Sequence, residues 1–460
     1  MIKVGKWIAK HKVIIVIISM LLLIPSFLGM AATRVNYDIL SYLPDSLETV
    51  EGQDIMVDEF GMGAFSMVVI EDMDLKDVAA LKEKFQDVEH VKDVLWYDSV
   101  ADLSIPVSMI PDKFKDAFFN GDATMMIALF DNTTSSDAAM EAVTDMRKIA
   151  NEQCFISGMS GVVTDIKNIA LEEMPIYVVI AAGLSLLVLL LAMDSLVIPI
   201  LFLLSVGLAV VYNLGSNIFL GQVCFITASL AAVLQLGVTM DFSIFLLHRY
   251  DEEKKLCASN EEAMENAICK TMSSITASSL TTIAGFLALC AMQLTLGADL
   301  GIVMAKGVAL GVICTIVILP SLILFFDKWV EKYRHRTFMP KLTNLSHFVS
   351  KHPMPVVVVF VLLMIPFGLA QSKTDIYYNI FAALPQDMPG IVGTNKLGED
   401  FGMMTNHFIL VREELTASQV SALCDEIKEV DGITQVVSLD SITGPGFETE
   451  LLPDELMNIV

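Results

Sequence analysis

The residue with the clearest capacity for chemistry is Asp241, an acidic side chain inside the long apolar stretch 222–248. A charged side chain at the centre of a membrane helix costs about 2.5–3.5 kcal/mol on insertion scales, and such residues usually mark ion or proton pathways. Burial also makes it easier for a carboxylate to take up a proton near neutral pH. The sequence therefore predicts a proton-relay role for Asp241; a polar packing residue or a buried ion pair is the alternative.

Hydroxyl side chains on the next apolar stretch are the predicted partners of Asp241. Asp241 lies eight residues before Arg249, and Ser278 lies eight residues after Lys270. Both therefore lie about 12 Å from the same membrane face at a rise of 1.5 Å per residue. Ser278 shares one helix face with Ser274, Thr281 and Gly285. Small hydroxyl residues can hydrogen-bond a carboxyl group, so Ser278 and Thr281 complete the predicted relay, with plain small-residue packing as the alternative.

A second intramembrane charge, Lys306, is at the wrong depth for Asp241. It lies 21 residues before Asp327, about 31 Å along a helix. We expect it to reach the outer interface or to form a charge pair with Asp299, and we do not assign it to the proton relay.

The elements that must position these residues are membrane-spanning helices. The 460 residues are 54% hydrophobic and 18% charged, with a mean hydropathy of +0.63, which excludes an ordinary soluble domain. Seven apolar stretches are long enough to cross a bilayer. They cover 13–32, 175–193, 196–214, 222–248, 274–295, 300–326 and 354–371. The first lacks a small-residue cleavage site and is interpreted as a retained anchor.

The net charge of −25 is unevenly distributed and predicts the orientation. Residues 33–174 carry a net −18 and residues 373–460 a net −11, so the rest of the chain sums to +4. Basic clusters at the amino terminus, at 248–255 and at 328–336 are cytoplasmic by the positive-inside rule. The acidic segments then lie outside. We therefore predict a multi-pass protein of the cell (plasma or inner) membrane with a cytoplasmic amino terminus, and no nucleic-acid partner.

The sequence contains no motif typical of a metal site, a cofactor site or an enzyme active site. The seven cysteines include no CxxC pair, and no phosphate-binding loop of the GxxxxGK[ST] type occurs. No nucleophile–base or metal-ligand cluster stands out in the acidic segments. We predict no metal, no cofactor and no enzymatic activity.

The chain repeats itself at an offset of 341 residues. Lys10-His11 recurs as Lys351-His352, and Phe60-Gly61-Met62 recurs as Phe401-Gly402-Met403. Further matches are Tyr37-Asp38 with Tyr378-Asn379 at this offset and, after a slip of one residue, Asp98-Ser99 with Asp440-Ser441 and Pro111 with Pro453. Parallel repeats of this length are common in transporters. The sequence thus predicts the start of a protein of roughly 680 residues, twice the offset, with the carboxy-terminal half of the duplication missing.

The acidic segment 33–174 has the pattern of an α+β domain. The strands 65–71, 91–97, 124–130 and 154–157 alternate with the helices 75–90 and 135–153, and Pro106 and Pro111 lie in an insertion. The order β-α-β-β-α-β predicts a ferredoxin-like sandwich. Residues 405–439 begin the same pattern again. The stretch 249–272 is predicted as an amphipathic interfacial helix, with a solvated connector as the alternative.

The predicted organisation is a polytopic α-helical membrane protein with ferredoxin-like extracytoplasmic domains. Its parts are a first span at 1–32, a porter-like domain at 33–174, a five-helix bundle at 175–326, a cytoplasmic linker at 327–353, a span at 354–372 and a partial second domain at 373–460.

The segment around Asp241 resembles a known family. Gly237-Val238-Thr239-Met240-Asp241-Phe242 resembles the fourth-span signature of the MMPL branch of the RND superfamily, and the segments 277–286 and 299–320 resemble its fifth and sixth spans. The bundle also resembles the sterol-sensing domain. The resemblance implies a proton-driven exporter of lipids or other hydrophobic molecules, with Gly237, Thr239 and Phe242 as motif residues. In that family Tyr usually follows the Asp and a second Asp-Tyr pair lies in the second half, whereas here Phe242 follows.

Two other functions remain open at this stage. One is a protein-export accessory similar to the SecD/SecF pair, and the other is a lipid-sensing or scaffold protein without transport. The expected partners are protons, a membrane lipid or hydrophobic substrate, the missing half of the same protein and, as an open alternative, further copies in a homo-oligomer.

Overall fold

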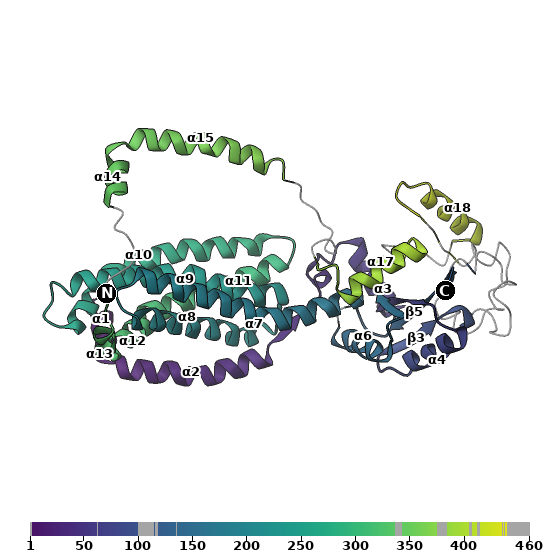
Figure 1. The fold of residues 1–460 in the computed structure, drawn as a ribbon, viewed down its shortest axis with the longest axis horizontal. Coiled ribbons are helices and arrows are strands. Elements are labelled where there is room, and N and C mark those ends of the chain that lie inside the picture. Colours follow the sequence, from purple (N-terminus) through teal and green to yellow (C-terminus); the bar gives the residue numbers. More distant parts are fainter. Residues whose placement is uncertain are drawn as a thin grey trace.

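The computed structural model consists of a helical bundle and an α/β domain joined by one long helix (Figure 1). It describes residues 2–61, 63–99, 115, 118–134, 136–335, 343–374, 384–403, 407–411, 415–434, 436 and 438. The predicted insertion at Pro106 and Pro111 lies outside these residues, as do Tyr378, Asp440 and Pro453 of the repeat. The domain projects from one end of the bundle, which we call the domain side; the opposite end is the far side.

Seven helices in the described residues are long and apolar enough to cross a membrane, as the sequence predicts. They are α2 (Lys12–Ala32), α7 (Met159–Ala192), α8 (Val197–Gly215), α9 (Phe225–Glu253), α10 (Asn260–Ala288), α11 (Leu296–Ile313) with its continuation into α12 (Leu319–Phe325), and α15 (Pro353–Gln371). A π-helical turn at Cys314–Ile318 joins α11 to α12. The protein is therefore a multi-pass membrane protein.

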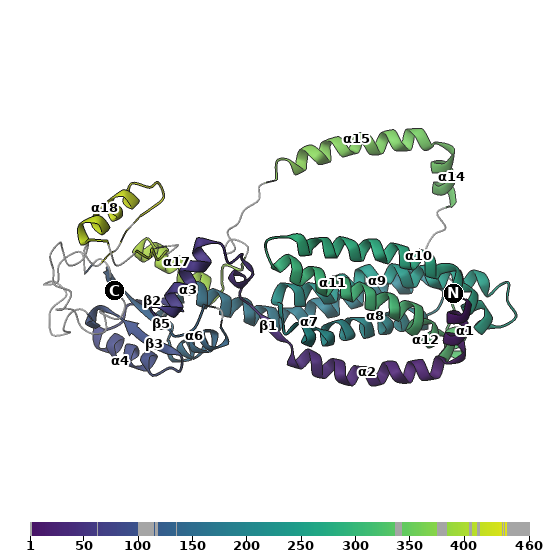
Figure 2. The same cartoon turned by 180° about the vertical axis from the view of Figure 1, so that it is seen from behind.

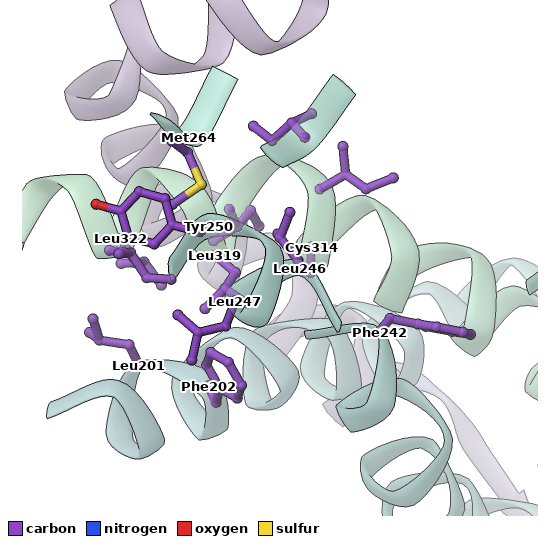
Figure 3. Packing of buried hydrophobic residues seen from close by; sticks show 14 of the residues in the cluster. Leu201, Phe202, Phe242, Leu246, Leu247, Tyr250, Met264, Cys314, Leu319 and Leu322 are labelled. Carbon is purple, nitrogen blue, oxygen red and sulfur yellow. The ribbon is translucent and has the colours of Figure 1, made fainter. Parts of the chain in front are cut away.

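The bundle core lies between α8, α9, α10 and α12. Phe202 of α8 and Leu246 and Leu247 of α9 are almost fully buried and pack with Leu319 and Leu322 of α12 (Figure 3). α2 packs along α8 on one side of the bundle (Figure 2). Their closest approach is at glycines, because a Cβ at Gly29 would lie only 2.2 Å from the Gly215 carbonyl oxygen. Small residues permit such contacts between membrane helices.

The stretch 249–272 is not a separate interfacial helix, so that prediction is wrong. α9 extends to Glu253, and α10 begins at Asn260 and continues without a break to Ala288. The apolar side of its first turns, including Ala263 and Ala267, is buried against the bundle, partly beneath the amino-terminal helix α1 (Ile2–Lys10). Packing against protein therefore replaces the predicted contact with lipid.

The repeat is visible in local structure as well as in sequence. In the first copy the rings of Trp7 and His11 lie 5.3 Å apart between centroids at an angle of 48°. At the same offset, Phe348 and His352 lie 5.2 Å apart at 51°, at the end of α14 (Thr343–Lys351). α14 precedes α15 as α1 precedes α2. α15 itself lies apart from the bundle helices (Figures 1 and 2).

The α/β domain is built on an antiparallel sheet with strand order β3-β5-β2-β6. The strands are β2 (Ala64–Glu71), β3 (Val91–Leu95), β5 (Ala123–Phe130) and β6 (Cys154–Ser157), and the short β4 (Phe119–Asn120) pairs with β5. Helices α4 (Leu75–Gln86) and α6 (Asp137–Ile149) cover one face. Alternating side chains of β2 explain this arrangement, because Val68 and Ile70 join the core beneath these helices while Met67 and Val69 face the other side.

Equivalent helices of the two repeats cover the other face of this sheet. α3 (Glu48–Asp58) packs with Met56 near Leu95 and Leu129, and α17 (Pro389–Phe401) packs with Leu397 on Met67 and Val69. Met56 and Leu397 are 341 residues apart, as are α3 and α17 themselves. A segment of the second copy therefore completes the domain of the first.

α17 is held on this domain by charge-assisted contacts at its amino end and in its middle. Asp165, which is 5% exposed, accepts a hydrogen bond from the backbone N–H of Gly390 at 2.7 Å and pairs with Arg147 at 2.5 Å. Lys396 pairs with Glu71 at 2.7 Å. A carboxylate at a helix amino terminus also interacts favourably with the helix dipole.

Glycine 393 allows α17 to reach the sheet, and its substitution tests the docking. A Cβ there would lie 2.7 Å from the Ile156 carbonyl oxygen, whereas nothing lies within 4 Å of a Cβ at the repeat-equivalent Gly52. We predict that Gly393→Ala destabilises the docked helix by about 1–3 kcal/mol through overpacking. Gly52→Ala is the matched control and should gain up to about 1 kcal/mol of helix propensity.

Hydrogen exchange of residues 389–401 and thermal unfolding measure both variants. Faster exchange of α17 in Gly393→Ala alone is expected. Equal exchange in the two variants would contradict the observed contact.

Candidate functional site

A groove between α9 and α10 contains the predicted relay residue. Its volume is about 510 Å³. The residues that line it are Val238, Asp241, Phe242, Phe245, Ser274, Ile275, Ser278 and Thr282. The groove thus combines one carboxylate and three hydroxyls with apolar walls.

The structure brings Asp241 and Ser278 to the same groove, as their depths predict. Asp241 lies on the outer surface of the bundle, and within the described part of the chain its carboxylate has no hydrogen-bond or ion-pair partner. Thr281, the other predicted partner, does not line the groove. Its hydroxyl donates to the Ser278 carbonyl oxygen at 2.7 Å, and Thr282 lines the groove in its place. Neighbouring residues of a helix point in directions about 100° apart, and the depth of a residue in the membrane does not give this direction.

The motif residues around Asp241 have three different environments. Gly237 lies at the surface with nothing within 4 Å of a Cβ, so its size serves no contact among the described residues. Thr239 is fully buried and donates to the Gln235 carbonyl oxygen at 2.7 Å. Phe242 is 8% exposed, belongs to the bundle core and lies at the end of the cluster away from Tyr250 (Figure 3). A residue that follows Asp241 is therefore directed into the protein.

Lys306 and Asp299 do not form the predicted pair. The Lys306 ammonium donates to the Asn213 carbonyl oxygen at 3.0 Å and to Asn217 Oδ1 at 2.5 Å. The Asp299 carboxylate instead accepts from the Cys224 backbone N–H at 3.0 Å. Lys306 and Asp299 are seven residues apart, about 10 Å along the helix axis, so each finds a nearer partner on another element.

A buried polar network on the other side of α9 was not predicted. Gln235 donates to the Gly307 carbonyl oxygen and accepts from Asn213, both at 3.0 Å. One turn further, Thr239 packs on Gly311, and then Ser243 and Thr315 share a hydrogen bond of 3.2 Å. The spacing of Gln235, Thr239 and Ser243 at four residues is a helical polar stripe and could have been found in the sequence.

Charged pairs gather at the far side of the bundle. The Glu253 carboxylate is almost fully buried and pairs with Arg249 at 3.0 Å and Lys270 at 2.7 Å. Lys254 pairs with Glu331, and its hydrogen bond lowers the pKa of the Glu331 carboxyl. These pairs join the carboxyl end of α9 to Lys270 of α10 and to Glu331 of the helix α13 (Asp327–Lys332).

The side chains of the groove determine which chemistry it could support. Within the described ranges, no group of three His, Cys, Asp or Glu side chains is placed to hold a metal ion. A single carboxylate among hydroxyls can bind and release a proton, and the hydroxyls can hydrogen-bond either of its forms.

Comparison with known proteins agrees with this arrangement. The "Putative membrane protein MJ1562" of Methanocaldococcus jannaschii is 26% identical over 254 residues, which are 53% of this chain and 62% of that protein. The "Mycolic acid-containing lipids exporter MmpL11" of Mycolicibacterium smegmatis is 25% identical over 287 residues, 57% of this chain and 29% of the exporter. The chain thus spans less than two thirds of either relative.

A solved structure is similar over part of the chain. SecDF, a translocon-associated membrane protein from Thermus thermophilus, superposes with a TM-score of 0.39 at 15% identity and covers 70% of this chain and 38% of its own. The model of the MMPL family matches residues 61–365, more than half of the chain, including the second to sixth spans and the Asp241 groove. The chain therefore belongs to the MMPL family of membrane transporters.

Proposed function

We propose that the chain is the amino-terminal part of a proton-motive-force-driven transporter that exports lipids or other hydrophobic molecules. In this proposal the α/β domain is a ferredoxin-like porter domain outside the cytoplasm, and residues 373–460 begin its second copy. Family membership supports transport. The printed name of the M. smegmatis relative supports a lipid-like substrate.

The observation that carries the proposal is the position of Asp241 in a groove between two membrane helices. Val238, Phe242, Phe245 and Ile275 give the groove apolar walls, and Ser274, Ser278 and Thr282 supply hydroxyls. Protonation of Asp241 would remove a charge from this surface of α9. The packing of α9 against its neighbours would then differ between the two protonation states, which is the requirement for coupling.

Helix α7 offers a physical connection from α9 to the domain. It is continuous from Met159 to Ala192, with its first turns buried in the domain and its later turns packed on α9 and α8. Ser229 of α9 contacts the sulfur of Met174 at 3.6 Å. A shift of α9 would therefore move α7, and α7 would move the Asp165 contact that holds α17.

Substitution of Asp241 tests the coupling. Asp241→Asn keeps the shape and one acceptor oxygen but does not titrate, so gradient-driven transport and proton flux should be abolished in the full-length protein. Ser278→Ala should have a partial effect, because it removes one of the three groove hydroxyls, and a hydrogen bond from such a hydroxyl to a charged group would be worth about 1.5–3 kcal/mol. Asp251→Asn, ten residues along the same helix, is the matched control and should behave as wild type.

Proton flux into proteoliposomes and the lipids released by cells that carry each variant are the measurements. Wild-type flux in Asp241→Asn would refute the relay and favour the lipid-sensing or scaffold function. Retained precursor proteins, with an unchanged lipid profile, would favour a SecD/SecF-like export accessory.

The proposed orientation places the far side of the bundle in the cytoplasm. The basic residues Arg249, Lys254, Lys270 and Arg334 all lie at that end, whereas the domain on the other side is strongly acidic. An excess of basic residues on one side of the membrane predicts the cytoplasmic side.

Labelling of single cysteines tests this orientation. In a variant without native cysteines, Lys76→Cys on α4 should react from outside intact cells, whereas Lys332→Cys should react only after permeabilisation. Both native side chains are exposed, so access to the reagent depends on the membrane side alone. Labelling of position 332 in intact cells would reverse the assignment.

A further inference from the structure

Lys306 has an unusual set of partners for a cation inside a membrane bundle. Its acceptors are a carbonyl oxygen in the last turn of α8 and the amide oxygen of Asn217, in the turn Ser216–Leu220 that follows α8. Neither acceptor is charged. Carbonyl groups in the last turn of a helix carry partial negative charge, so they attract a cation without binding its proton as firmly as a carboxylate would.

The number of acceptors matches a neutral amine. An ammonium has three N–H donors, and a neutral amine has two. In the described part of the chain, Lys306 has two acceptors. Loss of one proton therefore leaves both hydrogen bonds intact. In a lysine–carboxylate pair the same loss would leave a buried carboxylate uncompensated.

Asn213, whose backbone oxygen accepts from Lys306, also has a side-chain oxygen without a partner in the described residues. Gln235 must donate to the Gly307 carbonyl oxygen, so its own oxygen faces Asn213 and accepts from the Asn213 amide N–H. This direction of the network leaves Asn213 Oδ1 without a donor, although Asn213 is fully buried. An unsatisfied buried acceptor is costly unless a water molecule or another donor reaches it. The residue whose backbone carbonyl oxygen holds the Lys306 ammonium therefore also carries an unsatisfied side-chain acceptor.

The other ionisable side chains on neighbouring elements are engaged elsewhere. Tyr212 of α8 donates to the Ser19 carbonyl oxygen of α2 at 2.5 Å. Asp299 of α11 accepts from the backbone N–H of Cys224, the residue that precedes α9. Asp241 lies in the groove on a different face of α9, about 9 Å along the axis from Gln235 at 1.5 Å per residue. None of these side chains forms an ion pair with Lys306.

We propose that Lys306 is a second proton-binding group of the transport cycle, in a site formed with Asn213, Asn217 and Gln235 on the domain side of the bundle. The inference rests on the proposed function. In the step, the ammonium transfers one proton to a water molecule and becomes a neutral amine, and the reverse transfer restores its charge. Lys306 lies ten residues from the domain-side end of α11, whereas Asp241 lies twelve from the far end of α9. The two groups thus serve different parts of the proton path.

The alternative is that Lys306 only caps the end of α8, and Lys306→Arg separates the two roles. Arginine keeps the charge and its donors but does not lose its proton in proteins. If position 306 only caps α8, the Lys306→Arg protein should fold and transport normally. If position 306 carries a proton, the Lys306→Arg protein should fold but have a proton flux lower by about tenfold or more, because arginine cannot titrate. Lys332→Arg, at an exposed lysine outside the spans, is the matched control and should leave proton flux unchanged.

Asn217→Asp gives an independent test. The Asn217 side-chain oxygen already accepts from the Lys306 ammonium, so the substitution places a carboxylate next to the ammonium at almost constant volume and should hold Lys306 in its charged form. The expected result is a higher melting temperature together with reduced proton flux and a displaced pH optimum.

The measurements are proton flux in proteoliposomes across a pH series and thermal unfolding of the full-length protein. Wild-type flux in both Lys306→Arg and Asn217→Asp, with normal melting, would overturn the inference. If Lys306→Arg does not fold, Asn217→Asp alone decides. Absence of flux in the wild-type protein would instead refute the proposed function, so the two failures are distinguishable.

Discussion

The cost of polar side chains in a membrane is the constraint on which the bundle depends. Helix α9 satisfies it by separating its polar residues onto two faces. Gln235, Thr239 and Ser243 are fully buried, and each of their side chains forms a hydrogen bond within the bundle. Asp241 faces outward into the groove beside α10. The buried polar face fixes α9 against α11. A change in charge at Asp241 on the outward face can therefore move α9 only together with its neighbours.

Glycine residues make this separation sterically feasible. Gly307 and Gly311 lie on α11 where the polar stripe of α9 meets it, and a Cβ at Gly311 would lie 2.2 Å from Thr239 Cγ2. At Gly307 the missing side chain leaves room for Gln235 and Asn213, which a Cβ would approach to within 2.9 and 2.6 Å. Close backbone approach and hydrogen bonding are the main sources of helix association in lipid. Here the same glycines allow the close backbone approach and leave room for the hydrogen bonds.

The sequence predicted the spans and the place of Asp241 because both depend on local properties. Hydropathy finds the seven helices, and a fixed rise per residue brings Asp241 and Ser278 to one depth. Rotation about the helix axis depends on packing, so Thr281 was chosen where Thr282 lines the groove. The pairing of Lys306 depends on the carbonyl groups at the end of α8, which carry no sequence signal. The docking of α17 on the first domain is likewise a long-range contact. Only the equivalence of α3 and α17 in the two repeats could suggest it.

The contacts of α7 in the α/β domain indicate where a movement of the bundle would have its largest effect. Asp165 lies in the second turn of α7 and holds both Arg147 of α6 and the amino end of α17. α7 is helical throughout Met159–Ala192, with Pro175 between Asp165 and the spanning turns, so a shift of the spanning turns reaches the buried carboxylate through this position. Breaking a buried, charge-assisted contact costs several kcal/mol, whereas moving all its partners together costs little. The domain should therefore respond to α7 as one body in which both repeats take part, because α6 of the first copy and α17 of the second both bind Asp165.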